Sequence, residues 1–173
     1  MEGDGLLGAS FSYASSGQTP FGFAFGKRDQ FFVSEAFGGA ANASAISSYQ
    51  VTGDATLGVI SPSVPTTETA ACWVVVSGDG KYLYTTNAGS GTVSGYSIRH
   101  DGAIALLDAN GVTGTTGPGV SDVALSDNGR YLYALRSGAA VIVSFRVEHH
   151  GGLTLLGSTT IPSGSGANGI LAR

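Results

Sequence analysis

SGDGKYLY at residues 77–84 recurs almost unchanged as SDNGRYLY at residues 126–133. The two phrases lie 49 positions apart, and their alignment extends without a gap over residues 72–107 and 121–156. A looser third copy starts upstream with FGFAFGKRDQFFVSEA at residue 21. A fixed period near 50 residues is typical of a repeat architecture, so the repeat decides the expected fold.

Each copy contains four short runs that are rich in Val, Ile, Thr and Tyr. In the middle copy these runs are WVVVS, KYLYTTN, GTVSGYSI and AIALLDA, separated by DG, GSG and HDG turns. Such runs predict strands, and a DG or NG turn between apolar runs predicts a hairpin. No segment keeps a 3.6-residue period, so almost no helix is expected.

Four antiparallel strands per repeat describe the blade of a β-propeller, and we therefore predict an all-β fold. A Greek-key sandwich is the alternative, but sandwiches do not repeat their turn phrases so faithfully. The whole chain, 1–173, is interpreted as one partial propeller. Its blades cover approximately 20–70, 71–119 and 120–165, and single strands are expected at 4–14 and 167–172.

Three blades fall short of a closed ring, since closed propellers typically have 4–8 blades. An open arc exposes two apolar blade faces and unpaired strand edges, which favour association. We therefore predict that the chain self-associates or associates with missing N-terminal blades.

The composition excludes several classes of partner. The formal net charge is -4 with eight Lys and Arg residues, and no basic stripe is present for nucleic acid. No apolar run approaches the roughly 20 residues that cross a bilayer. The start MEGDGLLGAS lacks the basic region of a secretory signal, so we expect a soluble protein whose compartment stays open.

The repeats SGDGKYLYTTNAGSGTVSGYSI and SDNGRYLYALRSGAAVIVSFRV resemble the lactonase-type β-propellers. This seven-bladed family includes 6-phosphogluconolactonases and carboxymuconate-cyclising enzymes, and the chain is similar to its C-terminal half. The resemblance implies a site at the central cavity, where a Glu at the end of a second strand joins Arg and His from other blades. Glu35 matches that Glu.

The family's Arg-His pair, which opens a blade before its inner strand, is absent here. The corresponding places read Pro20-Phe21-Gly22, Ala71-Cys72-Trp73 and Val120-Ser121-Asp122. A lactonase needs a base to activate water and a cation or donors to stabilise the carbonyl oxyanion. One carboxylate cannot supply both, so the sequence does not predict catalysis by this chain alone.

Three further residues are candidates for a ligand site. Asn87 and Arg136 occupy the repeat position of Glu35 in the next two blades, and the three together could line one face of the cavity. Arg136 suits a carboxylate or phosphate, although a salt bridge to a neighbouring blade is an equal alternative. Asp122 could project into the channel or cap a turn. Glu35 itself could be a base, a ligand contact or a solvated loop carboxylate.

Metal and cofactor motifs are weak. His100, His149 and His150 are expected in outer-rim hairpins, far from Cys72, so neither a cysteine nucleophile nor a metal site is predicted. GSGANG at 164–169 fits G-x-G-x-x-G, but no helix follows it. We expect no cofactor.

Two functions remain open from the sequence. The first is a non-catalytic propeller scaffold or binding module for a small anionic or sugar-lactone ligand or a protein. The second is a lactone hydrolase that becomes active only when missing blades or another copy complete the ring. The fold alone does not decide between them.

Overall fold

The structure is a computed structural model, and it describes residues 10–53, 56–162 and 167–173. The described residues form three antiparallel sheets and two short 3-10 turns, Phe37–Gly39 and Ser137–Ala139. The all-β prediction is therefore confirmed. The first sheet contains β1 (Pro20–Phe25), β2 (Gln30–Glu35), β3 (Ala45–Val51) and β4 (Leu57–Pro65), paired in chain order.

The second sheet follows the same order, with a divided outer strand. Its members are β5 (Ala71–Val76), β6 (Tyr82–Asn87), β7 (Thr92–Ile98), β8 (Ile104–Leu106) and the short β9 (Gly114–Thr115), which also pairs with β7. The third sheet contains β10 (Asp122–Leu125), β11 (Tyr131–Arg136), β12 (Val141–Val147) and β13 (Leu153–Thr160).

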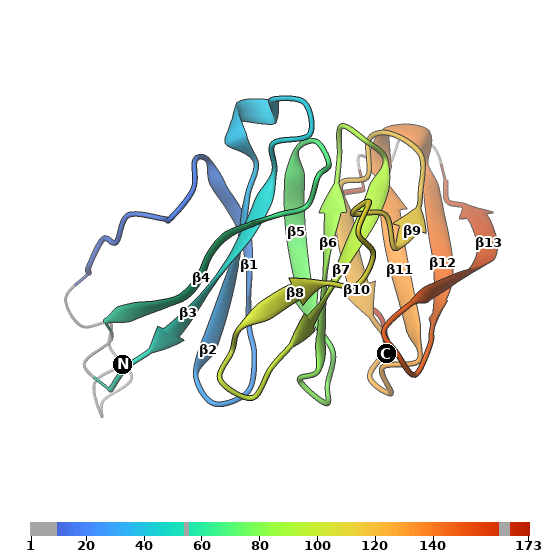
Figure 1. Ribbon diagram of the computed structural model, residues 1–173. Helices are drawn as coiled ribbons and strands as arrows, with labels where there is room; N and C mark the ends of the chain where they lie inside the picture. The colour runs from blue at the N-terminus through green and yellow to red at the C-terminus, as the bar shows by residue number, and fades with distance from the viewer. Residues whose placement is uncertain (1–9, 54–55, 163–166) are drawn as a thin grey trace.

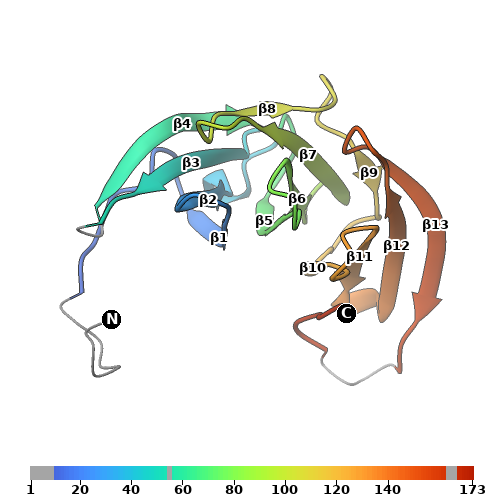
Figure 2. The same ribbon diagram turned by 90° about the horizontal axis from the view of Figure 1, so that it is seen from below.

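The three sheets stand side by side as the blades of an open arc (Figure 1). Seen from below, the inner strands β1, β5 and β10 line the concave side, while β4, β8 and β13 form the outer rim (Figure 2). We call the sheets the first, second and third blade. No helix among the described residues is both long enough and apolar enough to span a membrane.

The repeated phrase of the sequence is a hairpin turn with a fixed hydrogen-bond pattern. Asp79 Oδ1 accepts bonds from the Ser77 hydroxyl at 2.7 Å and from the Lys81 N–H at 3.0 Å. In the third blade, Asn128 does the same for Ser126 and Arg130, at 2.8 and 3.0 Å.

The glycine of each phrase has a positive φ, 75° at Gly80 and 66° at Gly129, a region that L-residues with a Cβ rarely occupy. The phrase recurs because both turns need the same acceptor and the same glycine.

The YLY run of the phrase packs against both neighbouring blades. Leu83 lies in a buried cluster with Phe32 and Ile46 of the first blade, and Tyr84 lies in a second cluster with Leu132 and Phe145 of the third. Because side chains alternate along a strand, consecutive residues of β6 serve opposite interfaces. Burial between blades is therefore the main source of the core.

The first two inner strands contain a register shift, which the third lacks. At each shift, a hydroxyl oxygen of the second strand accepts a hydrogen bond from a backbone N–H of the inner strand. The N–H of Gly22 donates to Ser34 Oγ at 2.9 Å, and that of Trp73 donates to Thr86 Oγ1 at 3.3 Å. Leu135 occupies the matching place in the third blade and offers no acceptor, and there the pairing is regular.

The end segments differ from the expectation of single strands. Residues 10–14 and 167–173 contain no strand, and the rest of the expected first segment, 4–9, lies outside the described residues. A strand needs a hydrogen-bonded neighbour, whereas here side chains hold the ends. Glu35 and Tyr49 bind the backbone of 16–17, and Asp122 Oδ2 accepts the N–H of Ile170 at 2.8 Å.

Candidate functional site

Glu35 ends β2, as expected, but its carboxylate is enclosed and 0% exposed. Oε1 accepts bonds from the Ser15 hydroxyl at 2.8 Å, the Gly17 N–H at 2.7 Å and the Ser47 hydroxyl at 2.6 Å. Oε2 accepts one from the Ser63 hydroxyl at 2.6 Å. Four donors occupy both oxygens, close to the full capacity of a carboxylate.

The N-terminal segment covers this carboxylate and the phenol beside it. The Ser16 N–H donates to the Tyr49 hydroxyl at 2.9 Å, and that hydroxyl donates to Ser16 Oγ at 3.1 Å. Burial raises the pKa of Tyr49, but hydrogen bonds from Ser15 and Ser16 outweigh it and lower the pKa below its ordinary value. The segment around 15–17 is thus fixed by polar contacts rather than by a strand ladder.

Asn87, at the same repeat position of the second blade, is also fully buried. Its Nδ2 donates to Thr92 Oγ1 at 3.1 Å and to Ser94 Oγ at 2.8 Å. Those hydroxyls donate onward, Thr92 to the Glu68 carboxylate and Ser94 to the Gly111 carbonyl, which fixes the orientation of the amide. Asn87 Oδ1 is left buried without a partner.

Arg136, the third member of this repeat position, is half-buried. Its Nε donates to the Pro118 carbonyl at 3.0 Å, in a loop tied to the second blade by the Gly117 N–H bond to the Gly91 carbonyl. The guanidinium therefore connects the third blade to the second.

Glu35 and Arg136 bond directly to connecting segments, whereas Asn87 bonds to β7 of its own blade and reaches Glu68 and Gly111 only through the two hydroxyls. The carboxylate and the amide are sealed from solvent, so neither presents polar atoms on the surface of this chain.

Asp122 anchors chain segments at the start of β10. Its Oδ1 accepts the N–H of Val123 and its Oδ2 that of Ile170, both at 2.8 Å. These contacts combine a local cap with a link to the C-terminal segment.

The inner strands present an aromatic pair that sequence reasoning did not select. Phe21 of β1 and Trp73 of β5 meet edge-to-face, with ring centroids 5.7 Å apart. Both are substantially exposed, at 54% and 40%. Phe21 lies at the opening of the first inner strand, where the family's Arg-His pair was sought. The apolar character of that position was the signal that could have found it.

Cys72 precedes Trp73 and is half-buried, with its thiol directed at the Ala70 carbonyl, 3.2 Å away. Burial raises the pKa of this thiol above its ordinary value. The three histidines lie in the β7–β8 and β12–β13 hairpins, which lead into the outer strands β8 and β13. In the described part of the chain, no three His, Cys, Asp or Glu side chains gather as a metal site.

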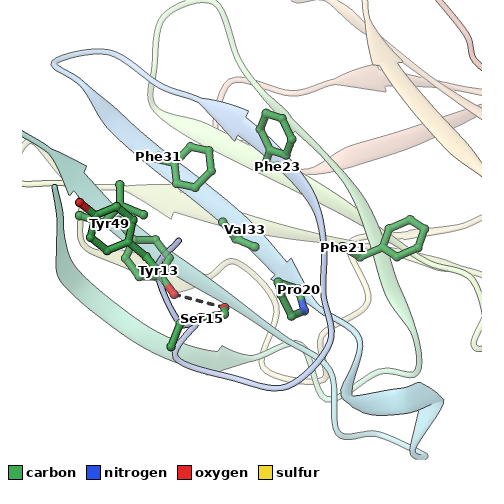
Figure 3. A pocket seen from close by; sticks show the side chains of 10 residues that line it. Tyr13, Ser15, Pro20, Phe21, Phe23, Phe31, Val33 and Tyr49 are labelled. Atoms are coloured by element: carbon green, nitrogen blue, oxygen red, sulfur yellow. Dashed lines mark hydrogen bonds between the residues drawn. The ribbon is translucent and has the colours of Figure 1, made fainter. Parts of the chain in front are cut away.

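A pocket of about 230 Å³ opens on the side of the first blade that faces away from the second. Figure 3 shows aromatic rings around it, with Ser15 at one side. The rings in its lining belong to Tyr13, Phe21, Phe23, Phe31 and Tyr49. It is an apolar hollow on an exposed blade face.

A larger pocket of about 760 Å³ lies between the two repeated hairpin turns. Its charged side chains are partly paired, Lys81 with Asp79 at 3.6 Å and Arg146 with Glu148 at 2.9 Å. The pocket therefore mixes both signs of charge and has no strong preference for an ionic ligand.

Solved structures with the same fold are numerous. A candidate 6-phosphogluconolactonase from Bacteroides uniformis matches with a TM-score of 0.70 at 20% identity, over 91% of this chain and 48% of its own. The periplasmic gluconolactonase of Pseudomonas aeruginosa matches at 0.65 and 16% identity, over 83% and 40%. A functionally unknown protein from Desulfotomaculum acetoxidans matches at 0.70 and 15%, over 82% and 42%.

At these identities the likeness shows the fold, and the chain spans less than half the length of each of these structures. Among curated protein sequences, none matches this chain. The model of the family described as lactonase, 7-bladed beta-propeller, matches residues 12–120, which is more than half of the chain. With three blades of the expected topology and this match, the chain belongs to the lactonase family of seven-bladed β-propellers.

Proposed function

We propose that this chain is a non-catalytic binding module built from lactonase-type blades. The observation that carries the proposal is the state of Glu35, whose two oxygens accept four hydrogen bonds in a fully buried position. A general base must reach the water that it activates. A carboxylate that is fully buried and bonded to three serine hydroxyls and a backbone N–H is out of reach of that water.

The donors beside Glu35 in the described structure are already bonded to its own carboxylate. Hydrolysis of a lactone requires donors or a cation at the developing oxyanion. The matching repeat positions hold Asn87, which is buried, and Arg136, which bonds to the Pro118 carbonyl. These groups serve as connections between segments.

The proposed ligand surface is the aromatic pair on the inner strands. Phe21 and Trp73 are exposed and belong to β1 and β5, the inner strands of adjacent blades, which line the concave side of the arc (Figure 2). Binding sites combine such apolar surface with a few polar groups, and aromatic rings suit the C–H face of a sugar ring. A sugar lactone or sugar acid is therefore the ligand class to test first.

A lactone hydrolase that requires additional blades is the second candidate. It is favoured by the gluconolactonase name of the Pseudomonas aeruginosa relative and by family membership. In that case the missing blades would have to supply the oxyanion donors, and Glu35 would have to lose bonds from the 15–17 segment.

A hydrolysis assay separates the two candidates. Gluconolactone opening is followed in a pH-stat with the wild-type chain, with Glu35→Gln, and with buffer alone. We expect all three rates to be equal. A wild-type rate above buffer that Glu35→Gln removes would establish the hydrolase instead.

Trp73 is the single tryptophan and reports on binding without a label. Titration with gluconolactone and with gluconate is expected to change its emission. Phe21→Ala should weaken that response at least several-fold, because half of the aromatic surface is lost. Phe25→Ala, an exposed aromatic change on the same strand, is the matched control and should leave it intact. A flat titration for the wild type would rule out this ligand surface.

A further inference from the structure

The outward face of the first blade is apolar, and it is open around Phe23 and Phe25, beyond the part where Tyr13 and Ser15 lie beside Tyr49. Phe23 and Phe25 of β1 are 60% and 63% exposed, and both rings contact Phe31 of β2. Phe32, which alternates with Phe31 along the strand, is buried against the second blade. The exposed rings therefore point away from the second blade, and Figure 3 shows Phe23 and Phe31 on the same face as Tyr13 and Ser15 of the N-terminal segment.

The strand register shows that the equivalent face of the second and third blades is covered by the preceding blade. Phe23 pairs with Val33, as Val74 pairs with Thr85 and Val123 with Ala134. Val74 and Val123 occupy the same position in the next two blades and are only 6% and 4% exposed, because the preceding blade lies over them. The face of the first blade is thus one half of a blade–blade interface.

The third blade presents the other half. Phe32 and Tyr84 in the first two blades are fully buried by the blade that follows each. Tyr133 holds this position in the third blade and is only partly buried, with Ile142 beside it on the same face. No further blade follows among the described residues.

A hydrogen bond accompanies each internal interface. Gln30 Nε2 donates to the His100 carbonyl at 3.2 Å, and the Tyr82 hydroxyl donates to the His149 carbonyl at 3.0 Å. In both cases the first residues of a second strand reach the outer hairpin of the next blade. Tyr131 starts the second strand of the third blade with the same phenol as Tyr82, so this donor is in place for one more blade.

We propose that these two faces bind each other between copies of this chain, with the third blade of one copy docking on the first blade of another. Both halves of the contact lie on this chain, and the contact continues the interface already repeated twice within it. The contact is head-to-tail, because it joins two different faces. Two copies that make this contact twice, each with its first and its third blade, close into a ring. Two copies give six blades, within the usual range of 4–8.

Mass measurement by light scattering over a range of concentrations tests the proposal. We expect the wild type to reach at least twice the 17.3 kDa of one chain. Phe23→Lys blocks the first-blade face and Tyr133→Lys blocks the third-blade face, so each variant alone should be monomeric. Mixed together, the two variants should form a one-to-one pair through their remaining intact faces.

Controls keep the test decisive. Leu155→Lys also places a charge on an exposed leucine, but Leu155 pairs with Phe145, whose side chain faces the second blade, so this variant should associate like the wild type. Phe25→Lys replaces Phe23→Lys if circular dichroism shows that the first variant is unfolded. A wild type that stays monomeric, single variants that still pair, or a mixture that remains monomeric would each overturn the proposal. A monomeric wild type would indicate instead that blades of a longer protein cover these two faces.

Discussion

The Glu35 carboxylate accepts a 2.6 Å hydrogen bond from the hydroxyl of Ser47, on the adjacent strand β3. That hydroxyl also accepts the N–H of Ser63 on β4 at 2.8 Å. One buried carboxylate therefore connects three strands of the first blade and, through Ser15 and Gly17, the N-terminal segment. This arrangement makes Glu35 a structural centre of the blade.

Glu35→Gln should lower the free energy of unfolding by about 1–3 kcal/mol, because the amide nitrogen must face a donor and leave it unpaired. Urea unfolding measures the change. Asp127→Asn makes the same chemical substitution at an exposed turn and should change stability by less than about 0.5 kcal/mol. Equal effects of the two variants would contradict the structural role.

Thr86→Val should disturb the inner strand of the second blade. The variant keeps the shape of the side chain but removes the acceptor for the Trp73 N–H. We expect a loss of about 1 kcal/mol and a shift in the emission of Trp73. Thr85→Val, in the adjacent fully buried position, removes a hydroxyl with only a 3.5 Å contact and should leave the emission unchanged. If Thr86→Val leaves emission and stability at wild-type values, the hydroxyl does not stabilise the register shift in β5.

Alkaline pH should destabilise the chain through Tyr84. Burial, with smaller effects of Tyr82 and Asp79, raises the pKa of Tyr84 above its ordinary value of 10.0. The folded state keeps this phenol protonated, and unfolding releases its proton once the pH exceeds the pKa of the phenol in the unfolded chain. The free energy of unfolding should therefore be constant with respect to this group below about pH 9 and fall above about pH 10.

Urea unfolding between pH 7 and pH 11 measures this slope. Tyr84→Phe should make the fall above pH 10 less steep and leave the part due to Tyr96, whose pKa is also raised by burial. It also removes the 2.8 Å bond to the Gly151 carbonyl and so lowers stability at pH 7. Thr85→Val loses no titrating group and should keep the wild-type slope. An unchanged slope in Tyr84→Phe would exclude Tyr84 as the cause.

Cys72 should react slowly with a thiol reagent. Its raised pKa leaves less thiolate at pH 8 than an ordinary cysteine has, and its side chain is half-buried. We expect reaction with a disulfide reagent to be at least several-fold slower in the folded chain than in urea, where the same thiol is exposed. Equal rates would show that the thiol is open and its pKa ordinary.

The repeat made much of the fold predictable. The four-strand blades, the DG and NG turns and the scarcity of helix follow from local patterns that a strand or a hairpin expresses by itself. The ends of β2, β6 and β11 at Glu35, Asn87 and Arg136 were also correctly placed. The single strands expected near the ends were not found at 10–14 and 167–173, because strand formation depends on a neighbour that local sequence does not reveal.

The candidate site was less predictable than the fold. The repeat alignment placed Glu35, Asn87 and Arg136 at one equivalent position, but it gave no information on their partners. Those partners, such as Ser15, Ser63 and Pro118, come from distant segments and differ from blade to blade.

The sequence by itself determined the type of blade, the number of repeats and the hairpin chemistry, since period-two alternation and glycine turns act over a few residues. Only the tertiary structure decided that the Glu35 carboxylate is sealed, that Phe21 and Trp73 stand together in the open, and which side chains form the two end faces that the repeat predicts to be exposed. The reason is physical: burial and hydrogen-bond saturation depend on which segments pack together in three dimensions, and residues that are hydrogen-bonded here lie as far as 70 positions apart in the chain.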